Sequence, residues 1–254
     1  MNRRLSQVAL SAAAALTLSL AAPVAAQASD TTVTAKRGPV ATAVSTQAAP
    51  AAASGSVRFT RSAVIGSSTS VYTSTRASVS VPGAVSWYVY ADVFVNGAAR
   101  VRNDLVASNN YPTGSASWPR SSGYGKVQLR NVRVESYDAN YNRTTSRLPD
   151  SNAVPVRRGT TYKIASTIQK RGKKVTIRAK NWKVYNPNGS TSAVRKLTVK
   201  RYYKGKWRGV KHIKLNRNGS GKVTFKQKKK FKYRVYLATT STIQGTYMYF
   251  PRKV

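Results

Sequence analysis

The sequence predicts an all-β protein made of two β-sandwiches. From Val57 onward, short runs of β-branched and aromatic residues alternate with clusters of Ser, Gly, Asn and Pro, and no helical apolar period lasts beyond two turns. The 254-residue chain is long enough for two domains that each have a core. It contains no cysteine, so we expect packing alone to hold those cores.

The N-terminus has the pattern of a signal peptide, which we assign to residues 1–28. Arg3 and Arg4 supply a positive start, the stretch 8–20 is short and apolar, and Ala26 to Ala28 offer a small-residue cleavage site. A retained membrane helix is the alternative, but the segment is Ala-rich and weakly hydrophobic. We therefore expect a secreted protein, extracellular or associated with the cell surface, without integral membrane insertion.

Residues 29–54 form a tract rich in Ala, Thr, Val, Ser and Pro with no amphipathic period. Such a composition buries too little apolar surface to offset its ordering entropy, so we predict a disordered spacer. It would be an inert tail, or a segment that threads out of an envelope or carries O-linked sugar. Export without disulfides indicates a bacterial and Gram-positive origin.

The first predicted sandwich covers residues 55–156. Its candidate strands are Val57–Ile65, Ser70–Val81, Val85–Val95, Lys126–Tyr137 and Asn152–Arg157. Between the third and fourth strands, we predict a long loop at 103–125 that carries Tyr111, Trp118 and Tyr124. Loops of that length are usually functional or mobile.

The second predicted sandwich is Lys-rich and covers residues 157–254. Its strands alternate with a period of two, and the basic residues take the outward positions. The inward series are Val175, Ile177 and Ala179; Leu197 and Val199; and Phe231, Tyr233, Val235 and Leu237. Turn signals fall at Arg171–Gly172, Asn186–Gly189, Lys204–Gly205 and Asn216–Gly221. This spacing predicts a sandwich of about seven strands.

Part of this second unit resembles a known family. The runs Gly205–Val210, Asn218–Phe225 and Tyr233–Val235 place a Trp strand, a Gly-containing hairpin and a Tyr-Arg strand in succession. That order resembles the bacterial immunoglobulin-like domains of secreted actinobacterial proteins. The resemblance implies an immunoglobulin-like fold from about Thr160 onward, with a role in adhesion, spacing or display. The first unit resembles the same class only in its strand rhythm.

We expect no catalytic site. Hydrolytic chemistry needs a nucleophile with an oriented base, or paired carboxylates. The second unit offers only His212, which the strand pattern places outward, and no carboxylate side chain. Any acid pair would have to come from Asp92, Asp104, Glu135, Asp138 and Asp150 of the first unit.

We also expect no metal site and no cofactor. Asp138, Asn140 and Asn142 have the spacing of calcium ligands, but the Gly and the final Glu of a calcium loop are missing. Asp and Asn are also typical of a hairpin turn, which is the interpretation we adopt.

Charge is the strongest functional signal in the sequence. The formal net charge is +38, and no acidic residue follows Asp150. Such a segment repels itself and attracts polyanions, whereas ordinary surfaces intersperse both signs. A solvated face without a specific partner is the alternative. The candidate polyanion-binding residues are Arg157, Arg158, Lys170, Arg171, Lys173, Lys174, Lys200, Arg201, Lys204, Lys206, Lys226, Lys228, Lys229, Lys230 and Lys232.

The expected partners are anionic cell-wall polymers or acidic polysaccharides, and non-specific nucleic acid is a further candidate. Phosphate contacts do not depend on base sequence, and no motif for specific DNA reading is present. The aromatics Tyr202, Tyr203, Trp207 and Tyr236 lie among the bases and could stack on sugars or nucleobases, although we expect the core to claim Trp207. We expect a monomer. The alternative function is a secreted cationic effector or antimicrobial protein that acts on anionic membranes.

Overall fold

The computed structural model describes residues 51–254 of the chain. The signal peptide predicted at 1–28 and nearly all of the spacer predicted at 29–54 lie outside these residues. At the start of the described part, the backbone N–H of Ala51 donates to the carbonyl of Pro82, and that of Ala53 donates to the hydroxyl of Ser146. Within residues 51–254, no helix has the length and apolar character needed to cross a membrane.

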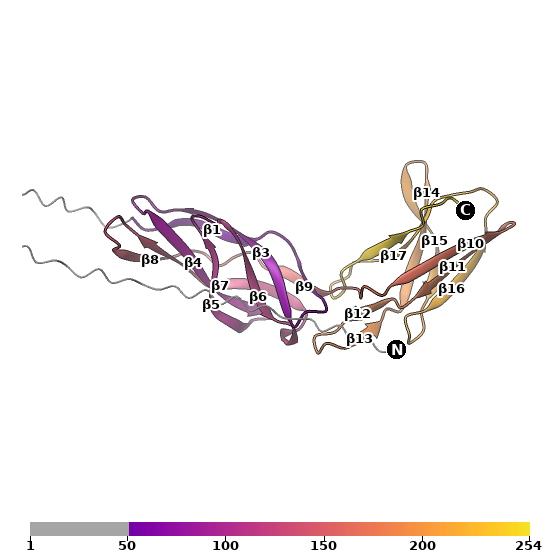
Figure 1. Ribbon diagram of the computed structural model, residues 1–254, viewed down its shortest axis with the longest axis horizontal. Coiled ribbons are helices and arrows are strands. Elements are labelled where there is room, and N and C mark those ends of the chain that lie inside the picture. The colour runs from indigo at the N-terminus through magenta and orange to yellow at the C-terminus, as the bar shows by residue number, and fades with distance from the viewer. Residues whose placement is uncertain (1–50) are drawn as a thin grey trace, which may run out of the picture. The chain divides into compact units, whose positions relative to one another are not determined.

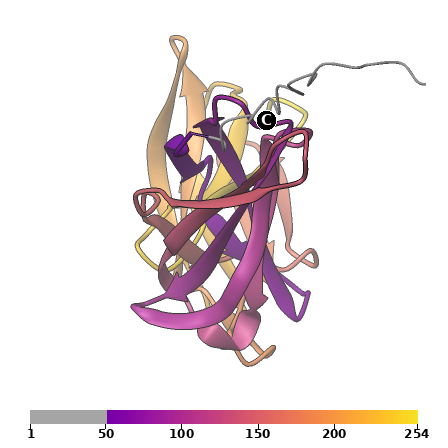
Figure 2. The ribbon, with the colours of Figure 1, turned by 90° about the vertical axis from the view of Figure 1, so that its left-hand side faces the viewer.

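Two sheets build the first sandwich (Figure 1). The three-stranded sheet runs in the order β1 (Ser54–Phe59), β3 (Ser70–Ser80), β6 (Thr113–Pro119). The larger sheet runs in the order β2 (Ala63–Ile65), β9 (Val154–Arg158), β7 (Gly125–Tyr137), β4 (Ser86–Val95), β5 (Ala98–Ser108), and β8 (Arg143–Arg147) pairs with β7. Figure 2 shows how strongly these strands, coloured indigo to magenta, twist and cross.

The core of the first sandwich lies between these sheets. On β4, Val89, Ala91, Val93 and Val95 are fully buried, as the two-residue strand period requires. Trp118 of β6 packs into the same cluster from the opposite sheet. Burial of these side chains is the main favourable contribution to folding in a chain without disulfides.

The prediction of a long loop at 103–125 is wrong. Most of this segment is regular: β5 runs to Ser108, β6 covers Thr113–Pro119, and a short 3-10 helix, η1, covers Arg120–Ser122. The segment looks like a loop because the first five residues of β6, Thr113–Ser117, are small. Its Gly114 crosses so close to β5 that an added Cβ would lie 2.2 Å from the carbonyl oxygen of Val106.

The other predicted strands of the first sandwich exist with shifted bounds. The predicted strand Val57–Ile65 is two strands, β1 and β2, which belong to different sheets. β2 pairs in parallel with β9, so the chain changes sheet within a few residues. β9 continues through Arg158, so this strand spans the boundary that we placed between residues 156 and 157.

The second sandwich also has two main sheets (Figure 1). One runs in the order β10 (Ala165–Arg171), β11 (Lys174–Lys180), β16 (Gly221–Lys226). The other runs in the order β15 (Lys206–Lys214), β14 (Lys196–Tyr203), β17 (Tyr233–Leu237), β18 (Thr246–Tyr249). A separate hairpin is formed by β12 (Lys183–Tyr185) and β13 (Thr191–Ala193).

The alternation predicted for the second sandwich is confirmed. The inward side chains of β11, β14 and β17 are buried, while Lys174, Arg178 and Lys180 of β11 are exposed. Phe231 differs from the prediction, because it lies before β17 and is only partly buried. The centre of this core is Trp182, whose indole N–H donates to the Ala165 carbonyl at 3.1 Å.

Both sandwiches have the same strand order. If the short strands β2, β8, β12 and β13 are set aside, each described sandwich has seven strands, with the first, second and fifth in one sheet. The other sheet has the order seventh, sixth, third, fourth. This is the immunoglobulin-like arrangement, in which the first, second and fifth strands face a sheet formed around the third and sixth. The protein is therefore an all-β chain with two immunoglobulin-like sandwiches.

Candidate polyanion-binding site

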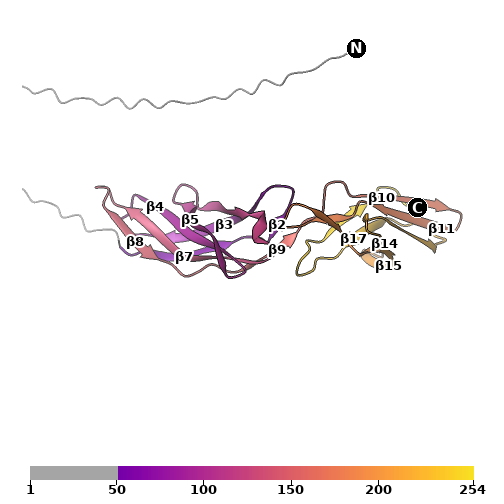
Figure 3. The same ribbon diagram turned by 90° about the horizontal axis from the view of Figure 1, so that it is seen from below.

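The hairpin between β10 and β11 carries the first group of candidate bases. Gly172 has a φ of 55°, a left-handed value that suits a tight two-residue turn. Arg171, Lys173 and Lys174 are exposed around this turn. Figure 3 shows the β10–β11 hairpin reaching the end of the second sandwich where the C-terminus lies.

The connection between β16 and β17 lies against this hairpin. The backbone N–H of Gln227 donates to the Lys173 carbonyl at 2.7 Å, and the Lys170 ammonium donates to the Lys228 carbonyl at 3.0 Å. Lys226 is the strand partner of Lys174. These contacts bring two basic runs, which are more than 50 residues apart in the sequence, to one place. The exposed lysines of this connection are Lys226, Lys228, Lys229, Lys230 and Lys232.

The turn between β14 and β15 is at the same end. Lys204 and Gly205 have φ values of 47° and 75°, which are the two positive values of a type I′ hairpin. The backbone N–H of Tyr202 donates to the Lys232 carbonyl at 2.9 Å, which ties the base of this hairpin to the β16–β17 connection. Lys204 and Lys206 are exposed. We name the basic side chains of these three segments the basic end: Lys170, Arg171, Lys173, Lys174, Lys204, Lys206, Lys226, Lys228, Lys229, Lys230 and Lys232.

A broad depression opens at the basic end. It has a volume of about 600 Å³, and its lining includes Lys170, Lys230 and Lys253. Lys253 was not among the predicted residues, because it is far in sequence from the basic runs. Backbone hydrogen bonds in both directions between Phe231 and Val254 hold the C-terminal residues beside the connection. Three ammonium groups around one hollow can make several contacts to one anionic group.

Three candidate residues, Arg157, Arg158 and Lys200, lie apart from the basic end, and Arg201 is held at its base. Arg157 and Arg158 are at the end of β9, and protein oxygens occupy both: Arg157 Nε donates to the Thr240 carbonyl at 2.9 Å, and Arg158 Nη1 donates to Asn186 Oδ1 at 3.1 Å. Adjacent charges in the sequence suggested a free cluster. Their hydrogen bonds indicate instead a structural role: both side chains bind the loops that contain Asn186 and Thr240.

Arg201 and Lys200 differ in where they point: Arg201 contacts the β16–β17 connection, and Lys200 lies on the other face of the sheet. Arg201 Nη1 donates to Gln227 Oε1 at 2.9 Å, and its guanidinium lies over the Phe231 ring at 5.1 Å. Lys200 leaves the strand on the opposite side, where its ammonium lies 3.9 Å from the centre of the Tyr236 ring. The strand period separates these neighbours, so a basic pair in the sequence is not a pair in space.

Comparisons with known proteins give no family. No family model matches the chain, and no curated protein matches its sequence. A marsupial T cell receptor matches at 9% identity over 77% of this chain and 71% of its own, with a TM-score of 0.29. The D00-D0 domain of intimin matches at 13% identity over 78% of this chain and 100% of its own, with a TM-score of 0.20. TM-scores this low carry no argument, so the immunoglobulin-like assignment depends on strand order.

The carboxylates of the first sandwich do not form an acid pair. Asp92 accepts hydrogen bonds from the Asn103 backbone and the Asn131 side chain, at 2.9 and 2.8 Å. Glu135 lies 3.4 Å from Arg133 and 3.5 Å from Arg143.

Asp104 lies on the other side of the larger sheet. Its partner on β4 is the fully buried Ala91, so Asp104 points toward the opposing sheet, whereas Asp92 follows Ala91 and points away. Burial raises the pKa of the Asp104 carboxyl, although the Ser117 backbone N–H donates to it. A site that needs Asp92, Asp104 and Glu135 together is therefore not assembled.

Asp138 forms the predicted hairpin turn. Its Oδ1 accepts from the backbone N–H groups of Asn140 and Asn142, both at 2.8 Å, and its Oδ2 accepts from the Asn142 side chain at 2.9 Å. The Asn142 side-chain hydrogen bond, with these backbone bonds, lowers the pKa of Asp138 against its burial. The aspartate oxygens are thus engaged by the turn itself, and among residues 51–254 no group of three or more His, Asp and Glu side chains could hold a metal ion.

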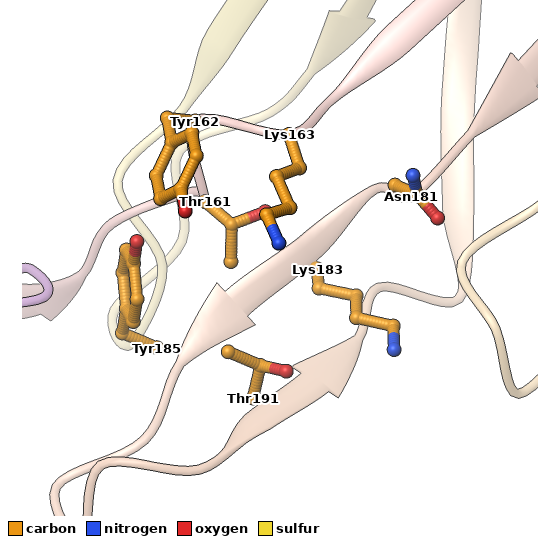
Figure 4. Close-up of a pocket in the computed structure, with 7 residues that line it drawn as sticks. All are labelled: Thr161, Tyr162, Lys163, Asn181, Lys183, Tyr185 and Thr191. Carbon is orange, nitrogen blue, oxygen red and sulfur yellow. The ribbon is translucent and has the colours of Figure 1, made fainter. Parts of the chain in front are cut away.

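Sequence reasoning missed a pocket at the β12–β13 hairpin (Figure 4). Its volume is about 490 Å³, and its lining includes Tyr162, Lys163, Asn181, Lys183 and Tyr185. Tyr162 is 79% exposed, and the Lys163 ammonium lies 5.7 Å from its ring centre. The sequence signal was weak, because these groups come from three short segments that only the fold brings together.

The predicted burial of Trp207 is wrong. Trp207 lies on the outer surface of the β15-β14-β17-β18 sheet, and Trp182 occupies the core instead. Around Trp207 are Tyr202, Tyr247 and Tyr249, which are 42%, 50% and 50% exposed. We name this surface the aromatic face and define it by Lys200, Tyr202, Trp207, Arg234, Tyr236, Tyr247 and Tyr249.

Proposed function

We propose that this protein binds anionic polymers through the basic end of its second sandwich. The observation that carries the proposal is the convergence of three turns. They gather exposed lysines and an arginine at one end of the sandwich, and no side-chain carboxylate is present after Asp150 to neutralise them. Because phosphate and carboxylate polymers carry dense negative charge, they release counterions when lysines bind, and the basic end matches that chemistry.

The proposed setting is outside the cell, at the envelope or in the surrounding matrix. The predicted signal peptide supports export, and the wall polymers and acidic polysaccharides found there are polyanions. The first sandwich would act as a spacer or as the site of a further contact. We propose no catalytic activity, because Asp92, Asp104 and Glu135 are held apart by different partners.

A salt titration tests this function. The purified mature chain is titrated with inorganic polyphosphate and with polygalacturonate over a range of NaCl concentrations. Affinity should fall linearly on a log–log plot as salt rises, with a slope that counts the lysine contacts. A missing or salt-independent interaction with both polymers would refute the proposal.

Vesicles separate this function from membrane damage. Vesicles of phosphatidylglycerol loaded with a fluorescent dye should bind the protein and keep their dye, because the described surface has no amphipathic helix to insert. Dye release at concentrations that saturate binding would favour a membrane-active effector over a polymer-binding protein.

A further inference from the structure

We propose that the aromatic face is a second binding site, which recognises sugar rings of a polysaccharide that carries carboxylates. The inference rests on the proposed function for the setting, and it adds a contact that charge alone does not provide. The basic end presents exposed ammonium groups, whereas the aromatic face holds several rings in contact with one guanidinium.

The rings of the aromatic face form a continuous row. The ring centres of Tyr202 and Trp207 are 5.3 Å apart, those of Trp207 and Tyr249 are 5.5 Å apart, and those of Tyr249 and Tyr247 are 4.7 Å apart. Their planes are tilted by 48° to 64° to one another. Such a row is a corrugated apolar surface rather than a slot between parallel rings.

Tilted rings favour sugars over nucleobases as the occupant. A nucleobase binds best when its flat face lies on a parallel aromatic plane. A pyranose ring instead presents C–H groups that pack on ring faces of several orientations, so successive sugars can follow a corrugated row. Exposed aromatic side chains in contiguous patches mark interaction surfaces, since isolated ones are ordinary on any protein.

Arg234 lies under this row and sets the preference for a carboxylate. Its guanidinium carbon is 4.5 Å from the Trp207 ring centre and 5.2 Å from that of Tyr247. Its Nε is buried and has no hydrogen-bond partner within residues 51–254. A planar guanidinium covered on its faces keeps its N–H groups at its edge, and with Nε buried it is the two Nη groups that would donate two parallel bonds to a carboxylate.

The surroundings are complementary to an acidic ligand. A groove of about 340 Å³ runs beside the row and includes Tyr202, Trp207, Tyr249 and the exposed Lys232. Lys200 is held on the same face above Tyr236. Because no side-chain carboxylate occurs after Asp150, a carboxylated sugar polymer meets attraction along the whole face.

The test compares polymers that differ in one property. Polygalacturonate has rings and carboxylates, polyphosphate has charge without rings, dextran has rings without charge, and oligo-deoxythymidine has flat bases. Binding is measured by titration calorimetry in about 0.5 M NaCl, where counterion release contributes little. We expect polygalacturonate to bind under these conditions and the other three polymers to bind at least about tenfold more weakly.

Three variants of the aromatic face complete the test. Trp207→Ala, Tyr247→Ser and Arg234→Lys should each weaken polygalacturonate binding about tenfold, and Arg234→Lys does so although it keeps the charge. The matched controls are Tyr162→Ser, an exposed ring elsewhere on this sandwich, and Arg178→Lys on the other sheet. The controls should leave affinity unchanged.

Tyr247 keeps the test meaningful if Trp207→Ala unfolds, because half of its surface is already exposed. A second readout is tryptophan fluorescence in a Trp87→Phe background, because Trp87 of the first sandwich is only partly buried. Bound polygalacturonate should shield Trp207 from acrylamide, while Trp118 and Trp182 are buried throughout.

The outcomes separate the two proposals. Polyphosphate binding at low salt with wild-type polygalacturonate affinity in all three variants would overturn the aromatic-face site and leave the basic end intact. Preferential binding of oligo-deoxythymidine that depends on Trp207 would overturn the sugar assignment. If the wild-type protein binds polygalacturonate but not polyphosphate, the proposal for the basic end is refuted and the proposal for the aromatic face stands.

Discussion

The basic end makes a quantitative prediction about charge position. We replace three exposed lysines of the β16–β17 connection, Lys228, Lys229 and Lys230, with Gln. The matched control replaces Lys180, Lys196 and Lys222, which lie at the opposite end of β11, β14 and β16 and are also exposed. Both variants lose three charges, so any difference between them reports where the polymer sits.

The expected magnitude follows from counterion release. Each contact to a flexible polyanion contributes about 0.7 to the slope of log affinity against log salt, so three lost contacts reduce the slope by about 2. At about 0.1 M salt this change corresponds to about 100-fold weaker binding. The control should keep its slope, because its lysines do not touch the polymer.

The assay is fluorescence anisotropy of labelled polyphosphate between about 0.05 and 0.4 M NaCl. Melting curves of the two variants serve as folding controls, and exposed Lys→Gln changes should alter stability little. Equal slopes in the two variants would refute the reasoning. That result would mean that charge acts as a diffuse coat and that the three converging turns have no special role.

Three further predictions concern the first sandwich. Asp104→Asn should raise the melting temperature at pH 7, because burial raises the pKa of Asp104 and its charged form destabilises the fold; the gain should shrink as pH falls through that raised pKa. Asp138→Ala should act oppositely: the lowered pKa stabilises the fold at neutral pH, so the variant melts lower at pH 7, and the difference should close as pH falls through the lowered value. A pH series of melting curves checks both, and curves that run parallel at every pH would contradict them. Gly114→Ala should cost about 1–3 kcal/mol in urea unfolding, because its Cβ would meet the Val106 carbonyl; a wild-type midpoint would show that β6 can shift.

Period-two alternation explains why the second sandwich was predictable. In β11, Val175, Ile177 and Ala179 are buried and the intervening charged residues are exposed, so burial alone specifies the strand. The turns were equally readable, because left-handed backbone at Gly172 and Gly205 restricts the choice of residue.

The first sandwich was harder to predict because its strands bury small and hydroxyl-bearing residues. Thr73 and Thr75 of β3 are buried, and the Thr75 hydroxyl donates to the Val106 carbonyl at 2.7 Å. A Thr or Ser buried in a strand cannot be distinguished by residue type from a Thr or Ser in a loop. The Thr73 hydroxyl likewise donates to the Arg61 carbonyl, and the Thr75 bond joins residues 31 positions apart, which a local pattern does not reveal.

The aromatic face was predicted only in part: Tyr202 and Tyr236 were named as residues that could stack on sugars, but Trp207 was assigned to the core and Tyr247 and Tyr249 were not named. A bulge between Val199 and Lys200 shifts the register of β14 against β15, so the alternation that holds at Leu197 does not continue to Trp207. A tryptophan in a strand is then easily assigned to the core. The alternation of β18 was the signal that could have found this surface. Tyr247 and Tyr249 lie on one face of β18 and pair with Tyr236 and Arg234 of β17, so this face of the sheet carries aromatic and basic residues.

The two sandwiches balance their cations in different ways, although their strand order is the same. In the first, Arg130, Arg133 and Arg143 lie near the carboxylates of Asp150 and Glu135, and Arg130 and Arg133 also lie over aromatic rings. In the second, which has no side-chain carboxylate after Asp150, the ring contacts are left without ion pairs, as with Lys200 over Tyr236 and Arg234 over Trp207.

This difference determines how far the charge of the second sandwich acts. An aromatic ring attracts a cation through its quadrupole, which stabilises the contact but cancels none of the net charge. A carboxylate cancels the charge, and its field then fades with distance. The ring contacts therefore order the cations of the second sandwich and leave their long-range field intact. A polyanion that approaches the aromatic face therefore meets Lys200 and Arg234 in positions that are already organised, so less side-chain entropy is lost on binding there than on the exposed lysines of the basic end.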